Sequence, residues 1–440
     1  MSFPRYPEYK DSGVEWLGDV PAHWGVVRVK NLLRRMGSGG TPDTQVDGHW
    51  TDEGNGIRWV AIGDMSGRDV VSDTEKRITE AGAASKGLDV WPEGTLLFSM
   101  YASLGHVAEL SVPAAINQAI LALQPDDDVS QSYLKRWFEY LRPSLKREAS
   151  SNTQDNLNAE KVRNLVALRP PLIEQRAIAR YLGRELQKVD ALISEQERLI
   201  ALLKEKRHAV ISHAVTKGLD PNVPMKDSGI EWLGEVPAHW GVVQSRRLFR
   251  VRSERALDGD QMLTASQKYG VLYQSEFVEL EGRRVVEVIK GVESLLHAEP
   301  DDFVISMRSF QGGIEWCRLR GSISFHYVML VPVKHVHPPF FSYLFKSMPY
   351  IQALRSTTDL IRDGQELRYS HFVQVPIPII PMAEQEKIAE FLVDKTVKMD
   401  ALIDEAGRAV VLLREHRAAL ISAAVTGKID VRQLNTTEAA

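Results

Sequence analysis

The chain has 440 residues, of which 44% are hydrophobic and 25% charged, a composition typical of a globular protein with two or more domains. Its single cysteine, Cys317, excludes an internal disulfide bond and a zinc site built from cysteines, and it fits a reducing cytoplasm. The net charge of −4 argues weakly against a protein coated in nucleic acid, although it is compatible with a local basic face. No apolar run predicts a secretory signal or a membrane span, so we expect a cytoplasmic protein without membrane contact.

The chain is an internal duplication. Residues 10–27, KDSGVEWLGDVPAHWGVV, return as residues 226–243 with only two conservative changes. A second pair, PLIEQRAIARYLG from Pro171, returns as PMAEQEKIAEFLV from Pro381. The period is longer than 200 residues, so each unit is a domain followed by a helix rather than a short solenoid repeat. Two like units suggest a pseudo-two-fold protein that contacts something two-sided.

Each unit opens with a non-helical segment that contains two tryptophans. Large aromatic side chains contribute most of the apolar area that small structural segments can bury. We therefore interpret all four as anchors in the core: Trp16, Trp24, Trp232 and Trp240.

The middle of each unit predicts a mixture of strands and helices. Short β-rich runs between Gly, Asn and Asp turns predict strands at residues 57–62, 95–100, 119–123, 303–307 and 327–333. Amphipathic stretches predict helices at residues 133–141 and 340–345. We expect an α/β (mixed α+β) fold in both halves.

The two middle segments align, although their polar residues differ. The offset between matched positions is 216 in the opening segments, becomes 207 at residues 96–105 and is 210 from Tyr133 onward. Apolar positions match, whereas unlike polar residues face each other: Tyr101 and Arg308, Asn117 and Ser324, Asn152 and Arg362, Asp155 and Gln365. We infer two similar scaffolds with different polar tips, as expected if each copy binds a different target.

Each unit closes with a helix of about 40 residues, which corresponds to about 60 Å. A proline-rich stop precedes each helix, and Glu174 and Glu384 occupy the first turns, where a negative charge favours the helix dipole. Apolar residues recur at heptad-like spacing, with a parallel row at Ile193, Ile200, Ile403 and Val410: Leu182, Val189, Leu192, Leu199, Leu203 and Val210, then Leu392, Met399, Leu402, Ala409, Leu413 and Leu420. A helix this long with one apolar stripe requires a partner helix.

The domain order predicts how the helices pair. The chain reads as a first globular domain at residues 1–171, a helix at 172–217, a second domain at 218–381, a helix at 382–427 and a tail at 428–440. If a two-fold axis relates the like units, the two helices form an antiparallel coiled coil that separates the two domains. The expected architecture is therefore two similar globular domains with a long antiparallel helix pair between them.

Catalytic motifs are absent from the sequence. The chain has no Walker A loop, and residues 37–42, GSGGTP, predict a tight loop rather than a dinucleotide fingerprint because no helix or spaced acidic residue follows. His337-Pro338-Pro339-Phe340 faintly resembles an amino-methyltransferase loop, but His replaces the Asn or Asp that would hold the target amine. The 12 histidines show no metal-ligand spacing, so we expect no metal site.

A nucleic-acid-binding pattern remains. Residues 244–255, QSRRLFRVRSER, contain five arginines among apolar residues, and Arg34-Arg35 is the apparent counterpart in the first half. Arginine near phosphates supplies sequence-independent affinity, whereas Asn, Gln, Arg, Ser or Thr on loops can read base edges. The candidate DNA-binding residues are Arg34, Arg35, Thr41, Tyr101, Asn117, Gln118, Asn152, Thr153, Gln154, Arg246, Arg247, Arg308, Ser324, Arg362 and Gln365. A solvated charged face is the alternative for each single arginine.

Over essentially its whole length, the chain resembles the specificity (S) subunit of type I restriction–modification systems. The resemblance rests on KDSGVEWLGDVPAHW and its copy, on Asn117-Gln118, on SNTQDNL at residues 151–157, and above all on PPLIEQRAIA with its copy IPMAEQEKIA. The second copy departs from the first by Ile-Pro-Met in place of Pro-Pro-Leu, which is a small change.

This resemblance implies a non-catalytic DNA-recognition role. Two target-recognition domains would each read one half of a bipartite, asymmetric site in double-stranded DNA. The antiparallel helices would set the spacer and dock two methylation (M) subunits, with restriction (R) subunits joining that core. The chain itself would contain no cofactor, since S-adenosylmethionine, ATP and magnesium are expected on the partner subunits.

Two rival hypotheses stay open. The first is a stand-alone methyltransferase or nuclease fused to its own DNA reader, against which the missing cofactor and metal motifs argue. The second is a coiled-coil scaffold that joins partners without binding DNA, which explains the helices but not the different polar tips on matched scaffolds.

Overall fold

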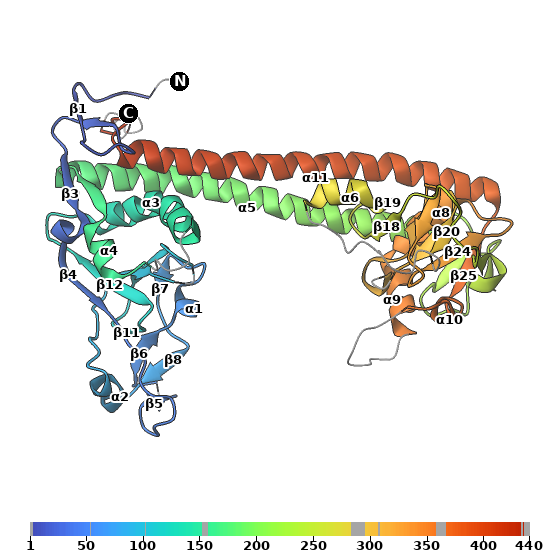
Figure 1. The fold of residues 1–440 in the computed structure, drawn as a ribbon, viewed down its shortest axis with the longest axis horizontal. Helices are drawn as coiled ribbons and strands as arrows, with labels where there is room; N and C mark the ends of the chain where they lie inside the picture. Colours follow the sequence, from blue (N-terminus) through green and yellow to red (C-terminus); the bar gives the residue numbers. More distant parts are fainter. Residues whose placement is uncertain are drawn as a thin grey trace. The chain divides into compact units, whose positions relative to one another are not determined.

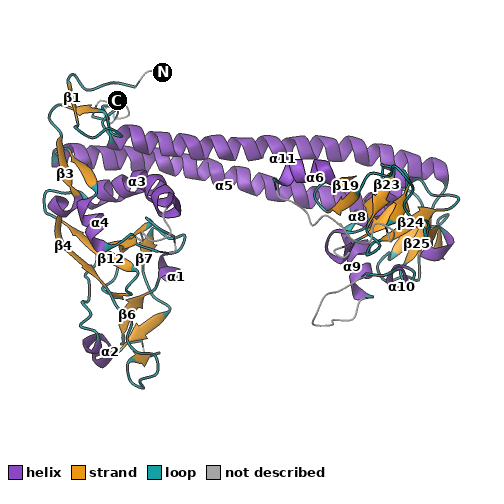
Figure 2. Cartoon of the chain, in the orientation of Figure 1, coloured by secondary structure: helices purple, strands orange, loops and turns teal. Residues whose placement is uncertain are grey.

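The computed structural model describes residues 3–52, 54–101, 103–151, 157–282, 295–306, 309–357, 367–432 and 434. It divides the chain into two compact units, one of Met1–Glu195 with Ala409–Ala440 and one of Gln196–Arg408. Helices and strands are mixed in both units, as the sequence predicts (Figure 2). The division cuts through both long helices, so each unit contains one globular domain and one part of each helix. The sequence instead predicts domain limits that separate each long helix from its globular domain, and those limits stay a prediction.

The opening segments form the same small hairpin in both units. In the first unit β1 (Tyr9–Asp11) pairs with β2 (Asp19–Pro21), and in the second unit β14 (Met225–Asp227) pairs with β15 (Glu235–Pro237) in the equivalent register. Trp24 and Trp240 are fully buried behind these hairpins, as predicted.

The other two tryptophans differ from the prediction. Trp16 is 52% exposed, so its interpretation as a core anchor is wrong. Its ring lies 6.2 Å from the ring of Tyr140 instead of entering the core. Trp232 is only partly buried: it packs against the core cluster of the second unit, and its Nε1 donates a hydrogen bond to the backbone oxygen of Pro376 at 3.1 Å.

The first unit is built on two sheets (Figure 1). The larger has the order β4-β12-β9-β10-β7, formed by Leu33–Ser38, Ile120–Pro125, Leu96–Ser99, Val107–Leu110 and Val70–Val71. The smaller has the order β11-β6-β8-β5, formed by Ala115–Ile116, Ile57–Val60, Lys76–Ile78 and Trp50–Thr51. A separate pair joins β3 (Gly25–Arg28) to β13 (Val166–Arg169). The remaining elements are η1 (Val29–Leu32), α1 (Ile62–Met65), α2 (Glu80–Ser85), α3 (Gln131–Ser151) and α4 (Ala159–Asn164).

The second unit has a four-stranded sheet of order β17-β24-β21-β22, formed by Phe249–Val251, Val328–Pro332, Phe303–Ile305 and Glu315–Trp316. Three strand pairs accompany it: β16 (Gly241–Gln244) with β25 (Pro376–Ile379), β18 (Leu263–Ser266) with β19 (Gly270–Tyr273), and β20 (Leu296–Ala298) with β23 (Gly321–Ile323). The other elements are η2 (Ser245–Arg247), α6 (Gln274–Glu281), α7 (Ser309–Gly312), α8 (Pro338–Lys346), α9 (Met348–Ser356) and α10 (Tyr369–Phe372).

The two units share one scaffold. The order β4-β12-β9-β10 in the first unit matches β17-β24-β21-β22 in the second. The register also matches, because Leu33 pairs with Pro125 as Phe249 pairs with Pro332. The smaller sheet recurs only in part: Met262 bridges Ser322 in parallel as β6 pairs with β11, and β18 pairs with β19 antiparallel as β6 pairs with β8. The structure thus confirms the predicted duplication of an α/β scaffold.

The central strands of the first unit are buried on both faces. Leu96 and Phe98 of β9 pack with Trp137 and Phe138 of α3, while Leu97 packs with residues such as Ile120 on the opposite face. Near-continuous apolar runs are the pattern expected of strands with both faces covered. This explains why residues 95–100 and 119–123 are readable as strands from the sequence.

Both long helices are present, as α5 (Leu172–Lys217) with 46 residues and α11 (Met382–Val425) with 44. In the first unit Leu182 and Leu186, near the start of α5, pack in one cluster with Leu420 and Ile421, near the end of α11. Arg417 Nε also lies 2.9 Å from Asp190 Oδ1. The second unit shows the reverse combination, with Ile211 at the end of α5 near Leu392 at the start of α11. Within each unit the helices therefore run antiparallel, as predicted.

The inward face of the helices differs from the predicted heptad row. Leu192 and Leu402 are 51% and 50% exposed, and Leu199 is also exposed. The parallel row faces inward instead, with Ile193 partly buried and Val410 buried. The inward positions in the first unit, Leu182, Leu186, Val189 and Ile193, follow alternating steps of four and three residues, which is the spacing of a coiled-coil seam. The row predicted from the sequence combined seam residues with neighbours that face solvent.

A glutamate in the first turn anchors each helix to its own domain. Glu174 is buried, accepts a hydrogen bond from Trp24 Nε1 at 3.0 Å and lies 2.8 Å from His23 Nε2. Glu384 makes the same contacts in the second unit, with Trp240 Nε1 at 3.1 Å and His239 Nε2 at 2.8 Å. The sequence predicts these carboxylates only as favourable to the helix dipole, whereas the structure shows them tied to the opening segment.

The glutamine that follows each glutamate joins the helix start to further segments of the same domain. Gln175 accepts a hydrogen bond from the backbone nitrogen of Ser130 at 2.8 Å and donates one to the backbone oxygen of Pro170 at 2.8 Å. Gln385 accepts from His337 N at 2.9 Å and donates to Ile380 O at 2.8 Å. The repeated Glu-Gln pair therefore joins the helix start to two segments of its domain.

The substitution Glu174→Ala tests this anchor. It leaves the buried indole N–H of Trp24 without an acceptor, which is expected to cost about 1–3 kcal/mol of unfolding free energy in the first unit. Urea unfolding followed by tryptophan fluorescence and circular dichroism measures the loss. The exposed Gln187→Ala on the same helix is the control and should change stability by less than about 0.5 kcal/mol. Equal stability of the two variants would contradict the anchoring role.

Candidate nucleic-acid interface

Equivalent turns precede the central strands β12 and β24. In the first unit Asn117 Oδ1 accepts a hydrogen bond from Ala119 N at 2.9 Å, and Ile120 N donates to the backbone oxygen of Asn117 at 3.2 Å. In the second unit Ser324 Oγ accepts from His326 N at 3.4 Å, and Tyr327 N donates to Ser324 O at 3.0 Å. The predicted match of Asn117 with Ser324 is thus a match of turn-forming side chains. Direct base contact by either residue stays a prediction.

The glycine-rich loop after β4 lies against the turn at Asn117. A Cβ on Gly39 would lie 1.7 Å from the backbone oxygen of Ile116, so only glycine permits this approach. The loop brings Thr41 to Gln118, and the Thr41 hydroxyl donates a hydrogen bond to Gln118 Oε1. Two candidate residues that are far apart in the sequence are therefore neighbours at one exposed tip of the first unit.

Arg34 and Arg35 point outward from β4 but differ in their contacts. Arg34 pairs with Asp127 at 3.2 Å, and both side chains are mostly exposed, so the pair is weak. Arg35 pairs with Asp89 at 2.7 Å and its guanidinium lies 4.4 Å from the ring centre of Trp91. A DNA phosphate that binds Arg34 would therefore replace only a weak ion pair, whereas one that binds Arg35 would replace a closer ion pair and a contact with the Trp91 ring.

The arginines of residues 244–255 in the second unit differ in exposure and in contacts. Arg246 and Arg247, in η2, are exposed, as is Arg250 on β17. Arg252 is instead held by Asp302 through two contacts of 2.7 and 3.0 Å, and by Glu254 at 2.6 Å. The strand register also places Arg250, rather than Arg246 or Arg247, at the position equivalent to Arg35, because Arg250 pairs with Val331 as Arg35 pairs with Gln124.

One exposed aromatic residue, Phe325, was missed by the sequence prediction. Phe325 is 51% exposed, and its ring lies 4.1 Å from that of His326 at the tip of the turn after Ser324. Tyr101, a predicted candidate, is also 48% exposed. The offset of 207 that matches Asn117 with Ser324 also matches Gln118 with Phe325, so the alignment already contained this signal.

Six predicted candidates lie outside the residues that the structure describes. They are Asn152, Thr153, Gln154, Arg308, Arg362 and Gln365. Their contacts with DNA stay predictions.

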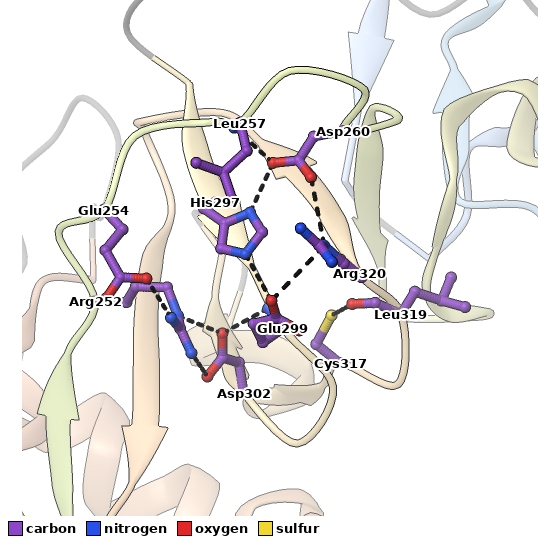
Figure 3. A network of polar contacts seen from close by, with 10 residues as sticks. All are labelled: Arg252, Glu254, Leu257, Asp260, His297, Glu299, Asp302, Cys317, Leu319 and Arg320. Carbon is purple, nitrogen blue, oxygen red and sulfur yellow. Dashed lines mark hydrogen bonds and ion pairs between the residues drawn. The ribbon is translucent and has the colours of Figure 1, made fainter.

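A network of charges around the buried His297 connects several segments of the second unit (Figure 3). His297 on β20 is 3% exposed, and its Nδ1 lies 2.6 Å from Asp260 and its Nε2 2.8 Å from Glu299. Arg320, after β22, approaches the same two carboxylates at 3.8 and 3.7 Å. The network ties the segment before β18 to β20 and to the approach to β23.

A second part of the network continues from Glu299. Its backbone nitrogen donates to Asp302 at 2.9 Å, and Asp302 binds Arg252. With both ring nitrogens of His297 facing carboxylates, both must donate, so the imidazole is protonated in this arrangement. Burial alone lowers the pKa of His297, but the hydrogen bonds with Asp260 and Glu299 outweigh it, and the pKa is raised. Burial opposes the shift of Asp260 as well, yet its pKa is lowered by the N–H of Leu257 and by His297.

The described residues show neither a metal-binding cluster nor a membrane-spanning helix. Among the described residues, no group of three or more His, Cys, Asp or Glu side chains is arranged to hold a metal ion. No described helix combines the length and apolar character needed to cross a bilayer. The His337-Pro338-Pro339 stretch forms the start of α8, with proline in its first turn.

Comparison with known sequences identifies relatives of one kind. Residues 21–204 match the family model described as type I restriction modification DNA specificity domain. The MjaIX specificity subunit of Methanocaldococcus jannaschii is 28% identical over 187 residues, 42% of each chain, and the EcoBI specificity subunit of Escherichia coli is 30% identical over 140 residues, 31% of this chain. These matches span 42% and 29% of the relatives' own length. The putative MjaX specificity subunit of M. jannaschii is 21% identical and matches 94% of this chain and 96% of its own.

Solved structures show the same fold. A chain from a study of complex assembly and conformational transition of the type I R-M system aligns over 92% of this chain and 98% of its own, with a TM-score of 0.68 and 13% identity. The HsdS subunit from Thermoanaerobacter tengcongensis aligns over 93% and 98%, with a TM-score of 0.50 and 14% identity. At these identities the likeness concerns the fold alone.

The network around His297 predicts a pH-dependent stability of the second unit. The pKa of His297 is raised in the folded state. Its ion pairs therefore contribute fully to the free energy of unfolding below the ordinary histidine pKa of about 6.5, and this contribution is lost as the pH rises through the raised folded-state pKa. The variant His297→Gln removes the buried cation of Asp260 and leaves only the more distant Arg320, which is expected to cost up to about 3–5 kcal/mol and to remove that pH dependence.

Urea unfolding of the full chain at a series of pH values measures both effects. His326→Gln, which changes an exposed histidine of the same unit, is the control and should behave like the original chain. An alkaline loss of stability that persists in His297→Gln would contradict the assignment.

Proposed function

We propose that this chain, a member of the type I restriction enzyme specificity-subunit family, reads a bipartite DNA sequence with one unit on each half-site. The observation that carries the proposal is the shared scaffold with unlike tips. Equivalent turns at Asn117 and Ser324 present Gln118 in one unit and Phe325 in the other. Two copies of one fold with different exposed groups are suited to two different sequences, because base edges are told apart by the groups that face them.

The proposal assigns the chain no reaction of its own. In the proposed complex, adenine-N6 methylation with S-adenosylmethionine and ATP- and magnesium-dependent cleavage belong to methylation and restriction subunits. The chain supplies DNA recognition to them, in the cytoplasm, where the DNA lies. The absence of a nucleotide loop or of a catalytic motif from the sequence is consistent with this division.

The helices offer a surface for the partner subunits. Several leucines and valines on the outer faces of α5 and α11 are 43–64% exposed, which is costly for a free chain: Leu192, Leu199, Leu202, Leu402, Val411 and Leu412. Exposed apolar rows of this kind mark protein interaction sites. We propose that two methylation subunits cover them and that restriction subunits join the resulting complex.

Substitutions at the two tips test the assignment of half-sites. Gln118→Ala is expected to relax sequence preference in one half-site only, and Phe325→Ala in the other, by about 1–3 kcal/mol per base position if the contact is direct. Selection of bound duplexes from a randomised library, with the methylation subunits present, measures both.

Arg246→Gln is the control for a phosphate contact. It should weaken binding to all sequences and reduce the slope of log affinity against log salt by about 1. If either tip variant behaved in this way, or changed both half-sites, that tip would not be a sequence reader.

The helices should set the unread gap between the half-sites. Insertion of one heptad into α5 between Ser194 and Lys206, with a matching heptad in α11 between residues 401 and 413, adds about 10 Å. This corresponds to about three base pairs of duplex. Methylation mapping should then show a longer gap between unchanged half-sites. Altered half-sites with an unchanged gap would contradict the spacer role.

A further inference from the structure

A negatively charged face on α11 borders a cleft in the second unit. Glu386, Glu390 and Asp394 stand one helical turn apart on α11, and together with Ala389, Val393, His337 and Pro339 they line a cleft of about 700 Å³. We call the helix face formed by Glu386, Glu390, Val393, Asp394 and Val397 the acidic face. Val393 and Val397 are 48% and 62% exposed, so the face combines carboxylates with uncovered apolar side chains.

The carboxylates of the acidic face are largely available. Among the described residues, neither Glu386 nor Glu390 has an ion pair or a side-chain hydrogen bond, and both are exposed. Asp394 is paired with Lys398 at 2.6 Å, and this hydrogen bond is the main cause of its lowered pKa. The unbalanced charge therefore comes mainly from Glu386 and Glu390.

The equivalent face of the first unit has the opposite charge. With the offset of 210 between the helices, Glu386, Glu390 and Asp394 correspond to Arg176, Arg180 and Arg184 of α5. Arg176 and Arg180 are exposed and have no partner among the described residues, whereas Arg184 pairs with Glu185 at 3.1 Å. Ile173, which is 79% exposed, lies on the same side one turn earlier. We call the face formed by Ile173, Arg176, Arg180 and Arg184 the arginine face.

The two faces complement each other when their helices are set antiparallel. In that register Ile173 stands opposite Val397, Arg176 opposite Asp394, Arg180 opposite Glu390 and Arg184 opposite Glu386. A parallel register also pairs the charges, but it places Ile173 against Ala383 and Val397 against Gln187. Only the antiparallel register covers the exposed apolar residues of both faces with each other.

We propose that the occupant of the acidic face is the arginine face of a second copy of this chain. Both faces repeat their charges every four residues, so successive ion pairs can form one helical turn apart. The contact joins two different surfaces, so it is heterologous, and it either closes into a pair with two equal contacts or extends to longer assemblies. The proposal concerns the free chain and does not depend on DNA reading.

Charge reversal tests the contact in the full chain. In sedimentation velocity at low salt, the original chain is expected to self-associate and to dissociate as salt rises, since exposed ion pairs are screened. Glu386→Arg/Glu390→Arg should weaken association by about tenfold or more, and Arg180→Glu/Arg184→Glu should do the same, because each places like charges opposite each other.

Combining all four substitutions exchanges the charges within two opposed pairs, Arg180 with Glu390 and Arg184 with Glu386, leaves Arg176 opposite Asp394, and should restore association to the original level. This rescue separates a direct contact from damage to the fold, because a misfolded variant cannot regain association through further substitutions. A chain that is monomeric at all salt concentrations would overturn the proposal. So would a four-fold variant no better than the double variants, or a loss of methylation-subunit binding with self-association unchanged, since the last result would identify a different occupant.

Cysteine cross-linking tests the register. The native Cys317 is fully buried and its pKa is raised to about 11, mainly by burial, so it should not interfere. Ile173→Cys with Val397→Cys should form a disulfide-linked product of doubled mass under mild oxidation at low salt. Gln187→Cys with Val397→Cys is the matched control for the parallel register. Preferential linkage of the control pair would overturn the antiparallel arrangement.

Discussion

One carboxylate per unit, buried at Glu174 and partly exposed at Glu384, fixes how each globular domain meets its long helix. Glu174 and Glu384 bind an indole N–H and an imidazole of the opening segment, while Gln175 and Gln385 bind the backbone on the other side of the helix start. A carboxylate with several donors at a helix N-terminus is favourable for both partners. Because this anchor is repeated, each helix leaves its domain in the same local geometry, and the remaining features of each unit are built on that constraint.

The scaffold and the exposed turns are under different physical demands. The equivalent strands β12 and β24 have buried apolar side chains that they must keep, such as Leu121 and Leu330, so the two copies remain alike there. The turns that precede these strands need only one side-chain acceptor, which Asn117 provides in one unit and Ser324 in the other. The residues just beyond that acceptor are free to differ. This separation explains how one fold can present Gln118 in one place and the aromatic pair Phe325-His326 in another.

The sequence predicted the features that depend on repetition and on apolar pattern, and it missed those that depend on three-dimensional pairing. The duplication, the α/β scaffold and the antiparallel helices follow from repeated motifs and from periodicity. The inward face of the helices was only partly correct, because Leu192 and Ile193 are both apolar and only the packing distinguishes them. The network around His297 was not predictable, since Asp260, Glu299 and Arg320 are brought to it by strand pairing.

The arginines show the same limit of prediction from sequence alone. Arg252 and Arg246 belong to one basic run in the sequence, yet Arg252 is held by Asp302 and Arg246 is exposed, and no local pattern separates the two. Charge alone therefore does not identify which residues are available to a phosphate. Exposure and the presence of a nearby carboxylate decide it, and both come from the fold.

Genome-wide mapping of adenine methylation, with and without this chain and in the presence of the methylation subunits, tests the central claim most directly. The account predicts methylation at one bipartite sequence that disappears without the chain, with two unlike half-sites at a constant separation. It also predicts that exchange of the residues between β4 and β12 for those of a relative changes one half-site and leaves the other and the separation intact. Methylation at a single contiguous sequence, or a pattern that is unchanged when the chain is absent, would contradict it.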